Sequence, residues 1–564
     1  MAPRVLVIGL DGFELTFADA LVREGRLPAI AAHRAAAAVV PLQPGPDHLT
    51  GLSWELFWSG CSSTTSGRAS AVEFDPATYA VWQEGARCST GFPAGTRTVV
   101  FDVPYADLDR SPEVRGVVGW GAHDPGLDAL QARPAAIGRR FLRRFGDYPA
   151  PHWVYGRPWA APADTERMGR DLAHAVDVRA AAAEWLLTEA VTDWELALVV
   201  VSEPHSAAEG LWHGVDPDHR LHDLPSAAPA REAMVRVYDA VDRLVASLVA
   251  RVNAAAGGLD AVVLCALTGM GPNRSDVPAM VLLPELLSRW SSGRARLRVP
   301  EKWASSPASV PVGSAAEVKW SRDWVEGAVV EPGRVAPPAP VRAAMRVLPS
   351  SVQRRLRNAR DARRRADLPM GHQSLGWEPA TWYADAWPAM RAFALPAFYD
   401  GRVRVNLAGR EARGVVPVDE YGAVLDELET LLRECHDPRT GEPVVETVVR
   451  GAAGDPRALD SSAADLTIVW AGSPNALAHP VHGCIGPVPY LRTGGHTGPF
   501  GFAWFTGAGF APGCLPEALA VDLPPTLSEL VAGAVPAGMA GRSLLGVLRA
   551  GAAVGEPAFG RAAS

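Results

Sequence analysis

The sequence predicts an α/β protein in which a central, mostly parallel sheet carries helices on both faces. Short apolar runs, each followed by glycine, proline or polar residues, have the length and composition of buried strands. Helical patterns lie between these runs, and such alternation is typical of this fold class. The strand-like runs are VLVIGL (5–10), TVVFDV (98–103), LALVVVS (196–202), AVVLCAL (261–267) and DLTIVW (465–470). The helical patterns are RAAAAEWLLTEAV (179–191) and REAMVRVYDAVDRLVASLVARV (231–252).

With 564 residues, the chain is long enough for more than one structural unit. Residues 402–450 read as strand, helix, strand, which predicts a small α+β subdomain. Residues 288–400, before this subdomain, read as an insertion. Its very basic part, 342–369, predicts either a solvated helix face or a lid that attracts anions. The expected units are the first part of the core (1–287), the insertion (288–400), the subdomain (401–455) and the last part of the core (456–564).

The composition is that of a soluble globular protein, with 48% hydrophobic and 21% charged residues. The net charge of −8 argues against nucleic acid as a partner. The six cysteines are scattered without a CxxC pair, which predicts reduced thiols. The sequence shows no leader peptide and no apolar run near the roughly 18 residues that span a bilayer. We therefore expect a cytoplasmic protein without membrane contact, and the Ala-, Arg-, Gly- and Pro-rich composition is typical of a GC-rich bacterial source.

Two polar residues stand at places where chemistry is expected. Asp11 ends the first strand-like run, and ligands of α/β folds bind at the carboxyl ends of strands. Thr50 precedes the apolar segment of LTGLSWELFWSG (49–60). Taken alone, an Asp at the end of a strand is usually a helix cap or turn former, and Thr50 is also compatible with the N-cap of a helix.

The surrounding motifs change this interpretation. VLVIGLDGF (5–13) is followed by a helix that ends in Gly-Arg-Leu-Pro (25–28), and Thr50 precedes Trp54 and Ser59-Gly60 at a fixed spacing. This opening resembles the alkaline phosphatase superfamily, in particular its type I phosphodiesterase/nucleotide pyrophosphatase branch. The resemblance implies an alkaline-phosphatase-like fold in which Asp11 binds a metal and Thr50 is the nucleophile.

The same resemblance implies a set of metal ligands. In SEPHSAAEGLWHGVDPDH (202–219), alignment on Trp212 puts His205 and Glu209 where the branch has an Asp and a His ligand. In RTGGHTGPF (492–500), His496 takes the place of a late Gly-x-His ligand. Two imidazoles and one carboxylate suit a single divalent ion, with zinc preferred to manganese or iron.

The expected second metal lacks two of its ligands. Where the branch reads Ser-Asp-His-Gly-Met-Gly, this chain has ALTGMGPN (266–273), so Leu267 and Thr268 replace Asp and His. Leucine cannot coordinate a metal and threonine is a poor ligand for zinc. Only Asp11 and Thr50 remain of that site, and the sequence therefore predicts one ion at most.

Three functions remain open at this stage. The first is a hydrolase or transferase that acts on a phosphate or related ester, such as a nucleotide, through Thr50 and at most one metal. The second is a catalytically degenerate pseudoenzyme that binds a ligand or partner. The third is a repurposed enzyme of a biosynthetic pathway that runs non-phosphoryl chemistry. The polar residues of VVGWGAHDPG (117–126), His123 and Asp124, are interpreted as structural.

Overall fold

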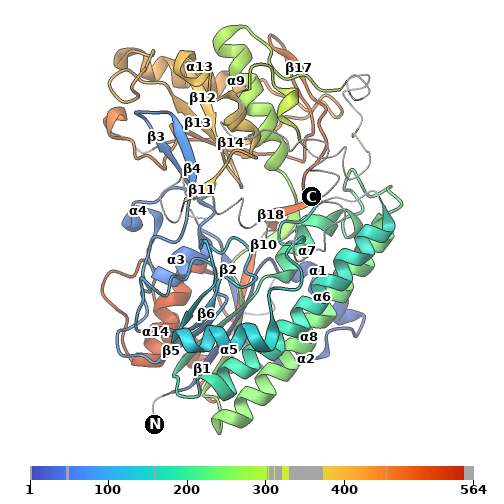
Figure 1. Cartoon of the computed structure of the whole chain (residues 1–564), viewed down its shortest axis with the longest axis vertical. Helices are drawn as coiled ribbons and strands as arrows, with labels where there is room; N and C mark the ends of the chain where they lie inside the picture. The colour runs from blue at the N-terminus through green and yellow to red at the C-terminus, as the bar shows by residue number, and fades with distance from the viewer. Residues whose placement is uncertain are drawn as a thin grey trace.

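The computed structural model describes residues 3–45, 50–157, 161–300, 303, 310, 320–328, 372–451, 454–498 and 500–551. The predicted basic stretch at 342–369 lies outside the described residues. Figure 1 shows a large sheet with its helices in the lower half of the molecule and a smaller sheet in the upper half.

The large sheet contains ten strands of the described chain, in the order β20-β2-β19-β9-β1-β8-β5-β6-β7, with β21 beside β2. Its centre is parallel, since β1 pairs in parallel with β8 and β9, and β5 with β8 and β6. Antiparallel pairs join β19 to β2 and β9, and β6 to β7. The strands are β1 (Val5–Leu10), β2 (Ala38–Gln43), β5 (Thr98–Phe101), β6 (Arg115–Val118), β7 (Gln131–Arg133), β8 (Leu196–Val201), β9 (Ala261–Ala266), β19 (Gly501–Thr506), β20 (Gly513–Cys514) and β21 (Ala518–Leu519).

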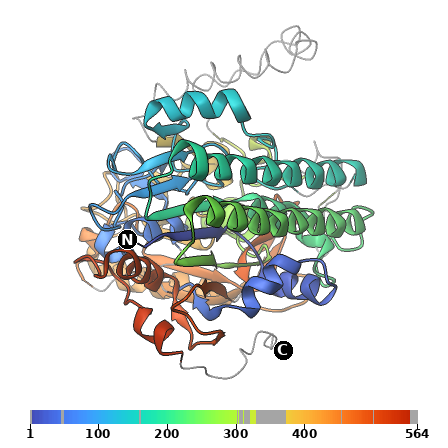
Figure 2. The ribbon, with the colours of Figure 1, turned by 90° about the horizontal axis from the view of Figure 1, so that it is seen from below.

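Helices cover both faces of this sheet, which confirms the predicted α/β class. Side chains of β1 alternate between two cores: Leu6 and Ile8 pack on one side, Val5 and Val7 on the other. Figure 2 shows α6 and α8, the two longest helices among the described residues, side by side in teal and green. Helices of the first face are α1 (Leu15–Arg23), α2 (Pro28–Ala35), α5 (Ala135–Phe145), α6 (Pro162–Trp185) and α8 (Ala227–Ala256), and those of the second are α3 (Ser53–Ser59), α14 (Leu523–Ala532) and α15 (Leu545–Ala550).

The smaller sheet is antiparallel, in the order β12-β13-β15-β14, and packs against α9 (Leu283–Ser292) and α13 (Tyr421–Arg433). The predicted strand, helix and strand of 402–450 are confirmed as β13, α13 and β14. One prediction is wrong: the run at 465–470 is β15 of this sheet, not a parallel strand of the core. Its strands are β12 (Ala392–Leu395), β13 (Gly401–Val405), β14 (Val445–Arg450) and β15 (Leu466–Trp470).

The physical reason for this error lies in the burial pattern of β15. Leu466, Ile468 and Trp470 are buried, whereas Thr467 and Val469 between them are partly exposed. One buried face and one solvent-exposed face are typical of an antiparallel sheet. Because Val469 is itself apolar, the sequence shows a nearly continuous apolar run, which resembles a strand buried on both faces.

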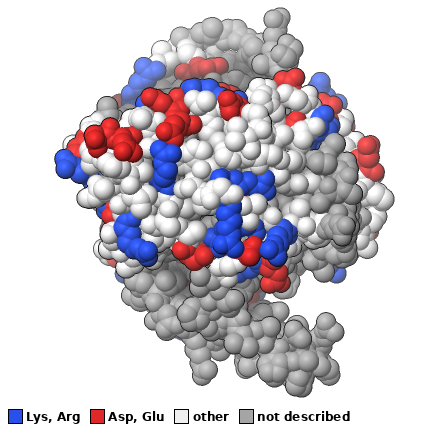
Figure 3. All heavy atoms as spheres, turned by 90° about the horizontal axis from the view of Figure 1, so that it is seen from above, with Lys and Arg blue, Asp and Glu red and all other residues white. Residues whose placement is uncertain are grey.

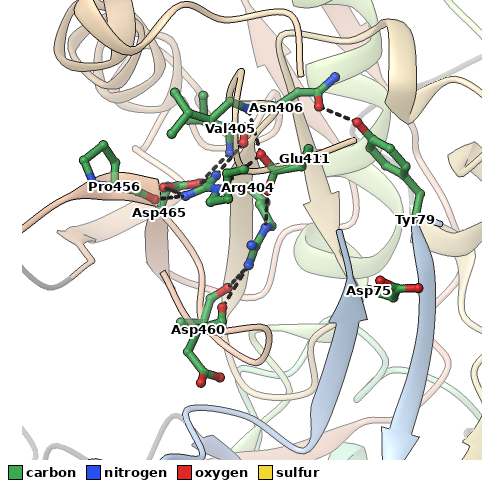
Figure 4. A network of polar contacts seen from close by, with 12 residues as sticks. Asp75, Tyr79, Arg404, Val405, Asn406, Glu411, Pro456, Asp460 and Asp465 are labelled. Carbon is green, nitrogen blue, oxygen red and sulfur yellow. Dashed lines mark hydrogen bonds and ion pairs between the residues drawn. The ribbon is translucent and has the colours of Figure 1, made fainter. Parts of the chain in front are cut away.

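A buried polar network ties the smaller sheet to the hairpin of β3 (Val72–Asp75) and β4 (Ala80–Glu84), as Figure 4 shows. The Arg404 Nε donates to Glu411 Oε1 at 2.8 Å, and Arg404 Nη1 donates to the carbonyl oxygen of Asp460 at 3.0 Å. Tyr79, in the hairpin, donates its hydroxyl to Asn406 Oδ1 at 2.7 Å. Hydrogen bonds to Glu411 and Asp460 stabilise the buried arginine, and the Tyr79–Asn406 bond joins the hairpin to the smaller sheet.

Figure 3 views the molecule from above. On the described part of this surface, basic and acidic side chains are interspersed and neither kind predominates. Among the described residues, no helix combines the length and the apolar character needed to cross a membrane.

Candidate active site

A small pocket opens at the carboxyl ends of β1 and β8, where the sequence predicts the site. Its cavity volume is about 30 Å³, room for one or two water molecules. A reacting group therefore fits inside, while the rest of a larger ligand would remain outside. The lining residues are Asp11, Gly51, Ser53, Trp54, Pro104, Tyr105, His123, Asp124, His205, Leu267, Thr268, Tyr399 and His496.

Asp11 and His205 form a buried pair in this pocket. Asp11 follows β1, and His205 lies in the first turn of α7 (Glu203–Leu211), which follows β8. The His205 Nδ1 lies 3.0 Å from Asp11 Oδ2, and Trp54 Nε1 donates to Asp11 Oδ1 at 2.9 Å. Burial raises the pKa of Asp11 and lowers the pKa of His205 well below its usual value. His205 is therefore a neutral imidazole, the form that binds a metal.

Gly12 allows this pair to form. Its φ of 64° lies in the left-handed region, and a Cβ at this position would sit 2.4 Å from the His205 Cα. Only glycine lets the turn after β1 pass so close to the start of α7. The Asp-Gly sequence after the first strand thus has a direct structural reason.

Glu209 lies one turn after His205 on the same face of α7, as its i, i+4 spacing predicts. Its Oε1 lies 3.7 Å from His205 Nε2, and its Oε2 accepts the Gly156 N–H at 3.0 Å. The guanidinium of Arg492 also pairs with Glu209 Oε1, and Arg492 Nε pairs with Asp276 Oδ2 at 2.7 Å. Burial raises the pKa of Glu209, and the charge of Arg492 opposes this shift.

His123 joins the cluster, although the sequence analysis interprets it as structural. It lies in the loop after β6, and its ring stacks on that of His205 with centroids 3.6 Å apart. His123 Nε2 is 3.7 Å from Glu209 Oε1, and its buried Nδ1 has no hydrogen-bond partner in the described chain. The glycines around it are the only sequence signal for a loop that approaches the site, and they do not specify a ligand.

His496, on β18 (Gly494–Gly498), completes the group. Its Nε2 lies 3.1 Å from His205 Nε2, and its Nδ1 lies 2.8 Å from the Thr268 hydroxyl oxygen. The ring of Tyr399 packs edge-on against it at 4.8 Å between centroids. Both predicted histidines, His205 and His496, thus hold a polar partner at Nδ1 and point Nε2 into the same space.

These residues fit a metal ion. Ligand atoms of His123, His205 and Glu209 all lie within 4.8 Å of one another. The distances of 3.1 Å for His205–His496 and of 3.7 Å for both His123–Glu209 and His205–Glu209 compare with roughly 3.3–3.4 Å expected between two ligands of a tetrahedral ion with bonds of about 2.0–2.1 Å. The contact of His205 Nδ1 with the Asp11 carboxylate is the arrangement that orients a metal-binding histidine.

The predicted nucleophile, Thr50, is not among the residues that line the pocket. Thr50 is buried, and its hydroxyl oxygen accepts the Leu52 N–H at 3.1 Å, while its neighbours Gly51 and Ser53 line the pocket. Leu267 forms an apolar part of the pocket wall. The structure therefore brings Asp11, His205, Glu209 and His496 close together, and it adds His123, Arg492 and Tyr399 to their surroundings. The metal-ligand roles of the four residues remain predictions.

Comparisons with known proteins give only distant similarity. No protein-family model and no curated protein sequence match the chain. Among solved structures, human ectonucleotide pyrophosphatase/phosphodiesterase 5 is similar at 10% identity and a TM-score of 0.43, over 97% of this chain and 99% of that one. Phosphonoacetate hydrolase from Sinorhizobium meliloti 1021 in complex with phosphonoacetate is similar at 14% identity and a TM-score of 0.44, over 94% and 96% of the two chains. At these values, the function must be argued from the site itself.

Proposed function

We propose that this pocket is the active site of a hydrolase or transferase for a phosphate or related ester of a small molecule. At most one divalent ion, zinc in preference to manganese or iron, would be held by His205, Glu209 and His496 together with His123. The attacking group would be the hydroxyl of Thr50.

The observation that carries this proposal is the group of His123, His205 and Glu209, whose ligand atoms lie within 4.8 Å of one another beside a small pocket. His496 adds its Nε2 at 3.1 Å from His205 Nε2. A bound divalent ion would supply Lewis acidity to a phosphoryl oxygen. The space of about 30 Å³ suits such a small reacting group rather than a whole substrate. The resemblance of the Asp11 and Thr50 motifs to the phosphodiesterase branch supports the same reaction class.

The remaining residues have supporting roles in this proposal. Asp11 accepts the Nδ1 proton of His205 and so keeps Nε2 of that ring as the ligand atom. The Leu52 N–H, which donates to the Thr50 hydroxyl oxygen, would stabilise negative charge that develops on this atom. Leu267 and Tyr399 restrict water around the reacting group.

A second candidate, a metal-free binding protein or repurposed enzyme, is favoured by one observation. Arg492 already neutralises Glu209, and the 3.1 Å contact between His205 and His496 satisfies both Nε2 atoms when one of them carries a proton. The same atoms are therefore satisfied without a metal, and the fold would then serve ligand binding or non-phosphoryl chemistry.

Elemental analysis of the dialysed, untagged protein tests the metal site. We expect about one equivalent of zinc, manganese or iron, which His205→Ala loses and His174→Ala, a change at an exposed histidine of α6, retains. Protein that holds no metal even after reconstitution would reject the metal site and favour the second candidate.

Hydrolysis of bis(para-nitrophenyl) phosphate by the same preparations tests the reaction. Thr50→Ala should abolish turnover with its metal content unchanged, because the nucleophile is lost while the ligands remain. Undiminished turnover in Thr50→Ala would remove Thr50 from the mechanism. Turnover in wild type without any metal would instead separate the reaction from the metal.

A further inference from the structure

Arg179 is a fully buried cation of α6. It contacts residues that precede two histidines of the proposed metal site in the sequence. The side chains of Arg179, Asp102 and Glu203 are all 0% exposed. Three aromatic rings, those of Phe101, Trp120 and Tyr148, surround the guanidinium at 5.7, 5.4 and 5.9 Å from its carbon to their centroids. A charge placed so deeply is stable only when every donor has an acceptor.

The guanidinium uses all three of its nitrogens. Nε donates to both carboxylate oxygens of Glu203 at 3.0 and 2.9 Å. Nη1 donates to Asp102 Oδ2 at 2.7 Å and to the carbonyl oxygen of Val200 at 3.1 Å. Nη2 donates to the carbonyl oxygen of Gly121 at 3.1 Å. One side chain therefore joins the ends of β5 and β8, the first residue of α7 and the loop after β6.

This connection reaches His123 through the loop. Asp102, whose φ of 55° lies in the left-handed region, accepts the N–H groups of Trp120 and Gly121, both at 2.8 Å. Arg179 binds the same carboxylate and the Gly121 carbonyl. The peptide two residues before His123 is thus held from both of its sides.

The connection reaches His205 through the helix. Glu203 is the first residue of α7 and precedes His205 by two positions. Its carboxylate is held by Arg179 and accepts the Tyr148 hydroxyl at 3.1 Å. Both rings of the His123–His205 stack therefore follow, by two positions in the sequence, a residue that Arg179 binds: Gly121 before His123 and Glu203 before His205.

We propose that Arg179 is a positioning residue that sets the stacking of His123 on His205 and thereby the geometry of the metal ligands. The expected effect of Arg179 on metal binding rests on the proposed function, whereas its expected effect on the ring stacking does not. Lysine carries the same charge, but its single ammonium cannot reproduce the planar fork that reaches Glu203, Asp102 and Gly121 at once.

The test compares Arg179→Lys with Arg404→Lys in the full-length protein. Arg404 is equally buried and pairs with Glu411 in the smaller sheet, so Arg404→Lys controls for the loss of a buried fork. Co²⁺ binding is followed by visible absorption well below the melting temperature of each variant, and the imidazole ring protons of the metal-free proteins are followed by NMR. We expect Arg179→Lys to weaken Co²⁺ binding about tenfold or more and to move the ring-current-shifted signals of His123 and His205, whereas Arg404→Lys changes neither.

Tyr148→Phe provides a milder variant in case Arg179→Lys does not fold. It removes one hydroxyl from Glu203, and we expect a smaller shift in the same direction, confined to His205. Unchanged imidazole signals and unchanged Co²⁺ affinity in a folded Arg179→Lys protein would overturn the proposal, as would an equal effect of Arg404→Lys. If the wild type binds no Co²⁺, the proposed metal site fails, and the imidazole signals alone then decide the role of Arg179.

Discussion

Two buried histidines in the segment after α7, His213 and His219, should make the stability of this region depend on pH. His213 follows α7, has no exposed surface, and its Nε2 lies 3.2 Å from the Ser226 hydroxyl. Burial lowers the pKa of His213 from 6.5 to about 3 and that of His219 from 6.5 to about 4. Both rings are therefore neutral in the folded protein throughout the neutral and mildly acidic range.

The sign of the effect follows from proton uptake. Below about pH 6.5 the unfolded chain binds a proton at each of these histidines, whereas the folded chain does not, so the free energy of unfolding falls as the pH falls. The stabilisation is complete above the unfolded pKa and is lost progressively below it, until the pH reaches the folded values. Between about pH 7.5 and pH 5 the loss is about 2 kcal/mol for each histidine, or about 4 kcal/mol for both.

Native-state hydrogen exchange of α8 peptides, read by mass spectrometry and corrected for intrinsic exchange rates, measures this change locally. A chain of this size need not unfold in one step, so a regional measurement is preferable to a global one. His213→Phe removes one titrating group, and its pH-independent cost cancels when the two pH values are compared. The variant should lose about 2 kcal/mol less than wild type between about pH 7.5 and pH 5. Equal losses in wild type and His213→Phe would refute the reasoning.

Three further predictions concern the proposed metal site. His496→Ala should lower the bound metal, and an undiminished content would remove His496 from the ligand set. Asp11→Asn should weaken metal binding roughly 10–100-fold, because an amide N–H at His205 Nδ1 favours the tautomer whose Nε2 carries the proton; wild-type affinity in a titration would contradict this role. Leu267→Asp combined with Thr268→His should add a second bound ion, since it restores two ligand types, and elemental analysis that finds no increase would contradict this expectation.

Much of the fold and of the site could be predicted from the sequence because the signals are local. The run that becomes β1 ends at Asp11, and a residue at the carboxyl end of a central parallel strand faces the usual ligand position. His205 and Glu209 share a face of α7 because they are one helical turn apart. These statements need only the periodicity of one element.

The parts that could not be predicted depend on contacts between distant segments. His123 reaches the site because Asp102 and Arg179 bind the peptide groups that precede it. No local sequence pattern predicts these contacts. Arg492 pairs with Glu209, although the two residues are 283 positions apart in the sequence. The run at 465–470 belongs to the smaller sheet for the same kind of reason, since the five residues of β15 fit either sheet until their neighbours are known.

The surroundings of Asp11 satisfy its carboxylate with protein groups alone. In the described structure both oxygens of Asp11 already have protein donors, Trp54 and His205. Thr268, where the resembling branch has a histidine ligand, contacts His496 Nδ1. A carboxylate and a hydroxyl so placed orient the two imidazoles from behind, a role that needs a polar group but no second ion. In the proposed metal site, the reaction would therefore depend on one group of ligands and on the residues behind them, which hold the imidazole rings in place.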